Sequence, residues 1–333
     1  MLKVTRQHAI FLIAIFSIST GTSAQLVSQK PAATLVWPTR VIRLVVGFPG
    51  GSSPDLVARA FAEPLSKALG QTVIVENHPG AGGNIAADLV AKSTDGHTIG
   101  IMINGNLTIA KLLNPKTPFD PAKDLTPISL IATAPLVLAV PASTPGTDAA
   151  SFWAAARAAG NQWNYGTPGN GTVAHIGMEL LKSRTRIDPV HVPYAGNPQV
   201  ITALLGGQIQ LALLPPGLAM AQIKASKLKA IGVTSSGRSP LVPELPSLSE
   251  GGVVDFQLEI WNAAAGPASM PTPVVAKLSA LFSDIARSPE MRQKLFAQGW
   301  QVAGTSTEGL VRRIKSDTAV LGGVIAQRNI KAE

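Results

Sequence analysis

The chain has no cysteine among its 333 residues, and it is poor in aromatic and charged residues. Without cysteine it can form no disulfide, no thiol nucleophile and no cysteine-ligated zinc site. Aromatic residues make up 5% of the chain and charged residues 14%, whereas hydrophobic residues make up 46%. We therefore expect a folded protein whose stability depends on core packing alone.

The positive charge of the chain is scattered. The formal net charge is +9, but basic residues cluster only at 182–186 and 224–229, and neither cluster is interleaved with aromatic rings. A nucleic-acid-binding surface usually combines a basic stripe with stacking platforms. The pattern therefore argues against nucleic acid as a partner and favours a weak attraction for small anions.

The chain also lacks a hydrophobic run, free of charges and prolines, that is long enough to span a membrane, and the run near the N-terminus is short. Lys3 and Arg6 precede an apolar run over residues 9–18, and Thr22-Ser23-Ala24 forms a small-residue cleavage motif. The run is far shorter than the roughly 20 residues that a membrane-spanning helix needs. The sequence therefore predicts a secretory signal over residues 1–24, cleaved after Ala24, and a periplasmic protein.

Two glycine-rich segments are the most informative feature. Residues 46–55 read VGFPGGSSPD and residues 164–175 read NYGTPGNGTVAH. Each follows a strand-like apolar run and opens a helix-like one. Such a turn directs unpaired backbone N–H groups and the positive end of a helix dipole at one spot, which binds anions. Two such segments suggest two lobes that close on one negatively charged small molecule.

The alternation of strand-like and helix-like segments predicts an α/β fold, with mostly parallel sheets flanked by helices. An apolar run at 128–140 contains Pro135, and we interpret it as two strands that meet where the chain crosses between lobes. We expect residues 25–132 and 246–333 to form lobe 1 and residues 133–245 to form lobe 2. The two crossovers would then act as a hinge.

Several long segments carry a family resemblance: IRLVVGFPGGSSPDLVARAFAEPLSKALGQTVIVENHPGAGGNIAAD, NYGTPGNGTVAH, HVPYAGNPQVITALLGGQIQ and IKASKLKAIGVTSSGRSPLVPELPSLSEGG. With the C-terminal helical segments, the resemblance extends over nearly the whole chain after the signal. In order and spacing they resemble the TctC-like or Bug receptors of tripartite tricarboxylate transport systems. The resemblance implies a type II periplasmic binding protein (Venus-flytrap) fold, no cofactor, a small carboxylate ligand and delivery to a membrane permease. We expect a monomer.

The resemblance also implies which residues contact the ligand. The first glycine-rich loop contributes Phe48, Pro49, Gly50, Gly51, Ser52, Ser53 and Asp55. The second contributes Tyr165, Thr167, Gly169, Asn170, Gly171, Thr172 and His175. Side chains outside these loops that we expect at the cleft are Asn106, Thr108 and Tyr194. Backbone amides of the two loops are the expected carboxylate donors.

Some of these residues have an alternative structural role. Asp55 is also a candidate N-cap, and His175 is equally suited to packing or capping. Asn106 and Thr108 suit a turn. Trp261 is assigned to packing at the core or hinge rather than to the ligand.

The chain departs from the family pattern at several positions. Ser52 replaces the second glycine of the first loop, where a positive φ would cost more than for glycine. Ala195, Ala203 and Leu214-Pro215 stand where the family often has polar or acidic residues. The second lobe should therefore present a more apolar wall, which favours a monocarboxylate or a ligand with an apolar body.

Other functions have weak support. There is no G-x-S-x-G nucleophile motif, so we do not expect an enzyme. Residues 169–174 match G-x-G-x-x-A, but Tyr194 stands where a dinucleotide site needs an acid. His175 and Glu179 share a helix face without a third metal ligand, so we expect no metal. The alternative function is a ligand-sensing receptor for a membrane signalling partner, without transport.

Overall fold

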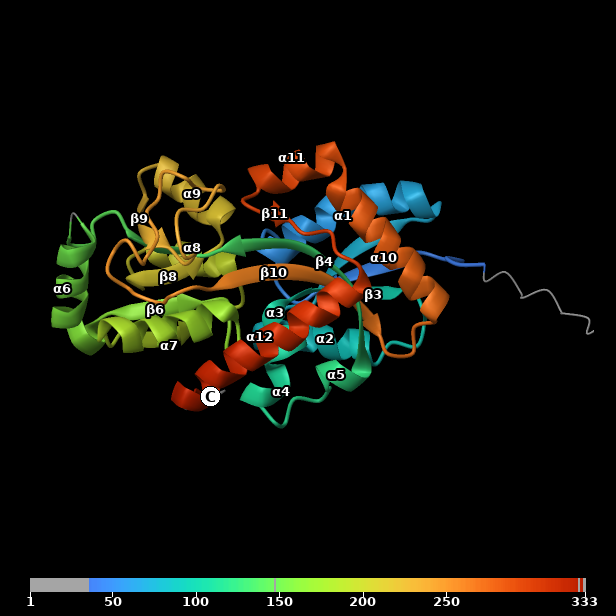
Figure 1. Cartoon of the computed structure of the whole chain (residues 1–333), viewed down its shortest axis with the longest axis horizontal. Coiled ribbons are helices and arrows are strands. Elements are labelled where there is room, and N and C mark those ends of the chain that lie inside the picture. The colour runs from blue at the N-terminus through green and yellow to red at the C-terminus, as the bar shows by residue number, and fades with distance from the viewer. Residues whose placement is uncertain (1–35, 147, 329, 332–333) are drawn as a thin grey trace, which may run out of the picture. The chain divides into compact units, whose positions relative to one another are not determined.

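The computed structural model describes residues 36–146, 148–328 and 330–331 (Figure 1). The predicted signal peptide lies outside the described residues. The strands are β1 (Ile42–Val46), β2 (Val73–Asn77), β3 (Thr98–Ile103), β4 (Leu125–Pro135), β5 (Val137–Pro141), β6 (Asn164–Thr167), β7 (Val190–Pro193), β8 (Leu211–Leu214), β9 (Leu228–Val233), β10 (Glu259–Pro267) and β11 (Gln301–Val302).

The helices connect these strands. The α-helices are α1 (Ser53–Leu69), α2 (Asn84–Ala91), α3 (Asn104–Thr108), α4 (Ala110–Leu113), α5 (Pro121–Asp124), α6 (Ala149–Ala159), α7 (Val173–Thr185), α8 (Asn197–Leu205), α9 (Pro216–Lys224), α10 (Thr272–Arg287), α11 (Pro289–Ala297) and α12 (Thr307–Arg328). Two 3₁₀ turns are η1 (Ala81–Gly83) and η2 (Gly160–Gln162).

Among the described residues, the strands form two sheets. The six-stranded sheet has the order β11-β4-β10-β3-β1-β2, and the five-stranded sheet has the order β7-β6-β8-β5-β9. The parallel strands expected from the sequence are β2-β1-β3 in one sheet and β7-β6-β8 in the other. Strands β4, β10 and β5 pair antiparallel with their neighbours. Both sheets are therefore mixed rather than mostly parallel. We call the six-stranded sheet with its helices lobe 1 and the five-stranded sheet with its helices lobe 2.

The chain changes sheets at Leu136 and again between β9 and β10. Pro135 ends β4 in lobe 1, and Val137 begins β5 in lobe 2, so the prediction of two strands meeting at this proline is confirmed. The backbone N–H of Leu136 donates to Thr234 Oγ1 (2.8 Å), and that hydroxyl donates to the carbonyl of Leu258 (2.7 Å). One threonine thus ties the two crossovers together. The lobe boundaries at 132/133 and 245/246 stay predictions.

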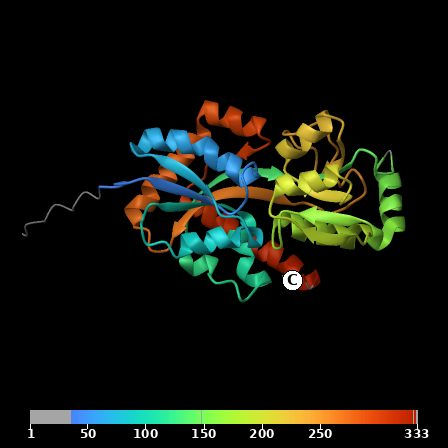
Figure 2. The same ribbon diagram turned by 180° about the vertical axis from the view of Figure 1, so that it is seen from behind.

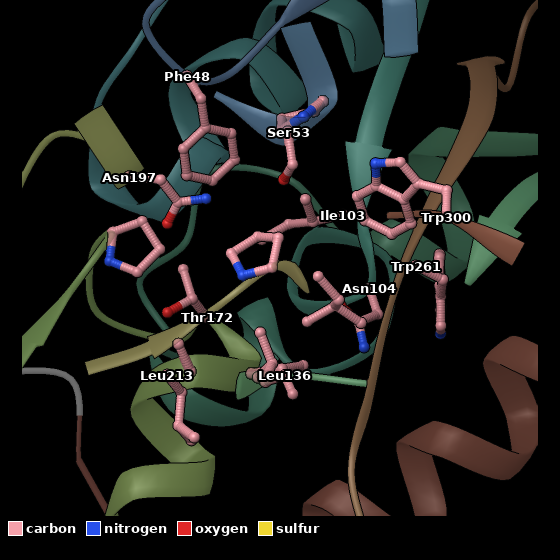
Figure 3. Close-up of a pocket in the computed structure, with 16 residues that line it drawn as sticks. Phe48, Ser53, Ile103, Asn104, Leu136, Thr172, Asn197, Leu213, Trp261 and Trp300 are labelled. Atoms are coloured by element: carbon pink, nitrogen blue, oxygen red, sulfur yellow. The ribbon is translucent and has the colours of Figure 1, made fainter. Parts of the chain in front are cut away.

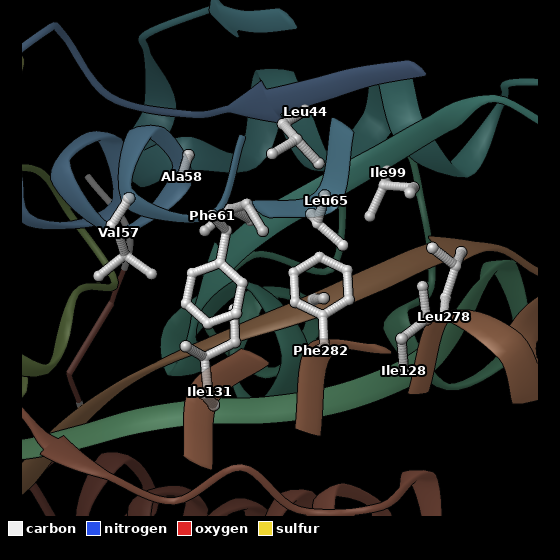
Figure 4. Close-up of a cluster of buried hydrophobic side chains, with 14 of the residues drawn as sticks. Leu44, Val57, Ala58, Phe61, Leu65, Ile99, Ile128, Ile131, Leu278 and Phe282 are labelled. Carbon is white, nitrogen blue, oxygen red and sulfur yellow. The ribbon is translucent and has the colours of Figure 1, made fainter. Parts of the chain in front are cut away.

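The larger core lies between the six-stranded sheet and the helices α1 and α10 (Figure 4). Phe61 of α1 stacks on Phe282 of α10, with ring centroids 5.4 Å apart. Both rings are fully buried, and burying a phenylalanine side chain contributes about 1.5–3 kcal/mol. The other face of this sheet is covered by α2, α3 and α12. The five-stranded sheet of lobe 2 also has a hydrophobic core on each of its faces.

The C-terminal helix α12 contacts both lobes, as Figures 1 and 2 let the reader follow. Leu310 in its first part packs in the lobe 1 core, whereas Leu321 and Ile325 pack among side chains of lobe 2. The sequence analysis assigned this whole segment to lobe 1. Across the described residues, no helix combines the length and the apolar character that crossing a membrane requires.

Candidate functional site

A cavity lies where the carboxyl ends of the parallel strands of the two sheets meet (Figure 3). Phe48 follows β1, Asn104 follows β3, Pro168 follows β6 and Pro215 follows β8. Open α/β sheets bind ligands at this edge. The space between these residues that no atom occupies is about 440 Å³, which includes open solvent at the mouth of the cavity. Its walls come from both lobes, and they include Leu136 of the first crossover and Ile260 of the returning strand β10.

The start of α1 forms one wall of the cavity. Ser52 is the N-cap, and Ser53 and Pro54 in the first turn face the cavity. The side chain of Ser52 makes no capping hydrogen bond, and its buried Oγ has no partner among the described residues. Its φ is −72°, so serine adopts this position without strain. The positive φ of this loop falls instead on Gly51, at 81°.

The prediction that Asp55 caps α1 is wrong, because the helix begins at Ser53 and places Asp55 in its first turn. Its buried carboxylate accepts hydrogen bonds from the backbone N–H of Gly51 (2.9 Å), from Asn77 Nδ2 (2.9 Å) and from Arg59 Nε (3.0 Å). Burial alone would raise the pKa of Asp55, but the hydrogen bonds from Arg59, Gly51 and Asn77 lower it below its ordinary value. Asp55 therefore holds the glycine-rich loop in shape from behind the cavity wall.

The start of α7 forms the facing wall. Thr172 is the N-cap, and Val173 and Ala174 follow it along the cavity. The Thr172 hydroxyl donates to the carbonyl of Gly169 (2.8 Å) and accepts from the backbone N–H of His175 (3.4 Å). His175 Nδ1 accepts from the backbone N–H of Gly171 (3.3 Å). The backbone N–H groups of Val173 and Ala174 belong to the first turn, where a helix offers no internal acceptor.

Two further helix starts reach the cavity, and sequence reasoning missed both. Asn197 begins α8 and Pro215 precedes α9. Asn104 begins the short α3, so Asn106 and Thr108, which also suited a turn, lie in a short helix. Buried oxygens of Asn104 and Asn197 (Oδ1 in each) lack a partner among the described residues. Unpaired buried polar atoms of this kind call for a partner that the protein does not supply.

The remaining wall is apolar. Trp300, Trp261, Leu136 and Leu213 line it (Figure 3). Trp261 is therefore part of the cavity wall as well as of the core, which differs from its assignment to packing alone. Among the described residues that line the cavity, none is Asp, Glu, Lys, Arg or His. Any charge on a bound molecule must therefore be met by backbone N–H groups, hydroxyls, amides and helix dipoles.

Of the residues predicted to contact ligand, Phe48, Ser53 and Thr172 line this cavity. Asn106 lies behind it: Nδ2 donates to the carbonyl of Gly82 (3.0 Å) and to Asn84 Oδ1 (2.9 Å). The Thr108 hydroxyl donates to the carbonyl of Asn104 (2.7 Å). Both side chains therefore shape the loops at the rim.

The other predicted aromatic and histidine positions lie deeper in lobe 2. Tyr165 is fully buried, and its hydroxyl donates to Glu179 Oε1 (2.5 Å). The His191 ring stacks between those of Tyr165 and His175, with centroids 4.8 and 4.4 Å away, and its Nε2 lies 2.7 Å from Thr167 Oγ1. Burial lowers the pKa of His191 to about 3. Tyr194 packs against the other side of the sheet.

The remaining predicted residues form the seam where the lobes touch. A methyl group on Gly105 would lie 2.5 Å from the carbonyl oxygen of Gly171. One on Gly196 would lie 2.7 Å from Pro49 Cδ and 2.9 Å from Ser52 Oγ. A methyl group on Gly82 would be just as close to the carbonyl of Asn170, and one on Gly169 would contact the backbone of Gly82. A methyl group on Gly51 would face Pro198. Gly50 has open space beside it apart from the Asp55 carboxylate. Backbone-to-backbone contact of this kind requires glycine, and it closes the cavity rim.

Cofactor and metal chemistry have few candidate residues. No group of three or more His, Asp or Glu side chains that could hold a metal ion occurs in the part of the chain that the structure describes. What the arrangement offers chemically is a small, uncharged chamber into which several helix N-termini point.

The chain matches known proteins over nearly its whole length. A relative, the "UPF0065 protein in tcbD-tcbE intergenic region" of Pseudomonas sp. (strain P51), is 31% identical over 99% of this chain and 96% of its own. The solved structure of the periplasmic binding protein BugD has a TM-score of 0.85, with 27% identity, and the match covers 89% of this chain and all of BugD.

A second solved structure, that of Rpa4515 from R. palustris with adipate, has a TM-score of 0.86 and 31% identity, covering 89% of this chain and 99% of the relative. Both structural relatives support the two-lobed periplasmic binding protein fold. The model of the tripartite tricarboxylate transporter family receptor (TctC) matches residues 57–330. The chain therefore belongs to the tripartite tricarboxylate transporter receptor family, TctC.

Proposed function

We propose that this protein captures a small carboxylate in the cavity between its two lobes. The observation that carries the proposal is the convergence of the starts of α1, α7, α8 and α9 on one cavity without ionisable side chains. Each helix start carries about half a positive charge, and its first-turn residues other than Pro54, Pro198 and Pro216 carry N–H groups. A carboxylate accepts several such hydrogen bonds at once, so it matches this site without an arginine or a metal.

The donors come from both lobes, which links binding to closure. Ser53 lies on lobe 1, whereas Thr172, Val173 and Asn197 lie on lobe 2. A carboxylate that bridges them stabilises the arrangement in which the glycine seam is closed. The relative from R. palustris was solved with adipate, a carboxylate, which supports the same chemistry here.

We further propose that the protein acts as a monomer in the periplasm and delivers its ligand to a membrane permease of the tripartite tricarboxylate type. Membership of the receptor family supports this assignment. Mass spectrometry of the exported protein tests the periplasmic location first, because a mature N-terminus at Gln25 is expected. Co-purification with a permease encoded beside it, only when ligand is present, tests delivery.

The decisive test of ligand capture is a thermal-shift and calorimetric screen of ligand-free protein against mono-, di- and tricarboxylic acids. The protein is first unfolded, dialysed and refolded to remove any bound molecule. A ligand at 100 times its Kd stabilises the folded state by about 2.7 kcal/mol, which a melting curve resolves. The proposal would be contradicted if no carboxylate in the panel stabilised the protein.

A matched pair of variants locates the site. Gly171 and Gly96 both have a positive φ, at 76° and 65°, so valine strains the backbone at either position. Gly171 lies in the second glycine-rich loop, whereas Gly96 has no neighbouring atom within 4 Å of an added Cβ. Gly171→Val should abolish the ligand-induced shift, and Gly96→Val should lower Tm yet retain it. Equal ligand responses from the two variants would place the site elsewhere.

A further inference from the structure

The residues that line the cavity carry no charge, and two acids outside the lining are already paired. Asp55 lies behind the first glycine-rich loop and is bonded to Arg59, and Asp317 is bonded to the indole of Trp261 and to Arg313 (2.8 Å). The Arg59 side chain is 55% exposed, whereas the Asp55 side chain is buried.

This electrostatic layout suits one carboxylate but not two. The helix starts of α1, α7 and α8 supply a set of donors for a carboxylate on one side of the cavity. On the other side lie Trp261, Trp300 and Leu136 (Figure 3). The indole N–H of Trp261 is already donated to Asp317, and the indole N–H of Trp300 is a single neutral donor. One neutral N–H does not match a second ionised carboxylate, whose burial would cost more than it returns.

The same surface suits an apolar body. Leu213 and Ile260 join the two tryptophans and Leu136, and all but Ile260 are less than 3% exposed. Aromatic and aliphatic side chains around an enclosed space bind apolar groups through dispersion and the hydrophobic effect. The amphiphilic arrangement therefore requires a ligand with one charged end and one apolar end.

We propose that the ligand is a monocarboxylate with a compact apolar body, rather than a dicarboxylate such as the adipate bound by the relative from R. palustris. This inference rests on the proposed function, because it specifies which carboxylate the cavity takes. Leu213 and the tryptophan pair Trp261 and Trp300 are then the residues that determine specificity. Aromatic and aliphatic bodies share this chemistry, and the experiment separates them.

The test is calorimetric titration of the refolded, ligand-free protein with benzoate, hexanoate, adipate and acetate at about pH 7.5, where adipate is a dianion. Benzoate or hexanoate should bind on the order of 100-fold more tightly than adipate, since the second charge of adipate would be unpaired. Acetate, which has the carboxylate without the body, should bind more weakly than the better of the two. The ranking of benzoate against hexanoate identifies the body as aromatic or aliphatic.

Two leucine variants test the role of the wall. Leu213 lines the cavity, whereas Leu181 on α7 is equally buried in the lobe 2 core and does not line it. Leu213→Ala should weaken binding of the preferred monocarboxylate about 10-fold by removing apolar contact, and leave acetate binding unchanged. Leu181→Ala should lower Tm by a similar amount without changing the ratio between the acids.

The outcomes separate this inference from the proposed function. If adipate bound as tightly as benzoate and hexanoate, or more tightly, the inference would be overturned. Carboxylate capture would remain intact. An equal loss of acetate and benzoate binding in Leu213→Ala would also overturn it. If no acid in the wider carboxylate screen bound, the proposed function itself would fail.

Discussion

The indole N–H of Trp261 donates a 2.6 Å hydrogen bond to Oδ2 of Asp317, so that the C-terminal helix supports one wall of the cavity. Asp317 also accepts from Arg313 Nε (2.8 Å), and Arg313 reaches Glu259 Oε2 (3.0 Å) at the start of the returning strand β10. One network therefore connects the cavity wall, a crossover between the lobes and α12. The position of Trp261 depends on a helix that lies outside the cavity.

Replacing Asp317 should loosen this wall. Asp317→Ala leaves the buried indole N–H of Trp261 without its acceptor, so the free energy of unfolding should fall by about 1–3 kcal/mol. Affinity for the bound carboxylate should fall several-fold, because the wall is no longer held in place. Urea unfolding and calorimetry measure the two effects. Glu63→Ala, which breaks the exposed ion pair with Lys67, is the control and should change neither.

The glycine seam predicts that a single methyl group blocks closure. Gly105→Ala places a Cβ against the carbonyl of Gly171, yet alanine favours the helix in which Gly105 lies. The variant should fold with a nearly unchanged Tm but bind ligand at least about 10-fold more weakly, since a misplacement of about 1 Å can have that effect. Its radius of gyration in solution should also exceed that of the wild-type protein.

Gly237→Ala provides the control for this test. Gly237 has no atom within 4 Å of an added Cβ, so the substitution should alter neither affinity nor dimensions. Equal affinity of Gly105→Ala and Gly237→Ala would indicate that the seam does not have to close for the ligand to bind.

Asp55 predicts a loss of stability in acid. Burial raises its pKa and the bonds from Arg59, Gly51 and Asn77 lower it by more, so the folded-state value is depressed. A depressed carboxyl pKa contributes stability above the unfolded value of about 3.9, and that contribution is lost as the pH falls through the folded value. Asp55→Asn should cost about 1–3 kcal/mol at neutral pH and flatten the stability profile below about pH 4. Urea unfolding of the wild-type protein and of Asp55→Asn, from neutral pH to below about pH 4, measures this difference in stability. Parallel stability profiles for the two proteins would contradict the prediction.

His191 predicts a second pH dependence, at higher pH. Burial lowers its pKa to about 3, and His175 and Lys182 act in the same direction. The unfolded chain protonates this imidazole near pH 6.5, so stability should fall as the pH drops from about 6.5 towards 3. His191→Gln should reduce the slope of unfolding free energy against pH by the contribution of one proton. An NMR titration of the His191 ring should detect no protonation between pH 5 and 8, and a midpoint within that range would refute the assignment.

Much of the fold was predictable because it rests on local pattern. The alternation of apolar strands with amphipathic helices, and the glycines between them, predicts the parallel strands on each side of β1 and β6. Pro135 predicts the crossover, because a proline cannot lie inside a central strand. Both rules concern neighbours along the chain, so they need no knowledge of distant contacts.

The candidate site was predictable only where it coincides with those turns. Phe48, Ser53 and Thr172 line the cavity as the glycine-rich loops suggest. The role of Asp55 was misjudged because the helix starts three residues earlier than a cap at Asp55 requires, with Ser52 as its N-cap, which makes Asp55 a first-turn acceptor. Asn197 was missed although Gly196, Asn197 and Pro198 also stand between a strand and a helix, so the same turn pattern could have indicated it.

The sequence by itself determined the α/β class, the two glycine-rich helix starts and the family, since each depends on residues close together in the chain. Only the tertiary structure decided which side chains face the cavity. Trp261, Trp300 and Leu213 come from distant segments, and they meet because two sheets and α12 pack around one seam. Burial and unpaired polar atoms are properties of that packing, so the absence of charge in the cavity emerges only after the chain has folded.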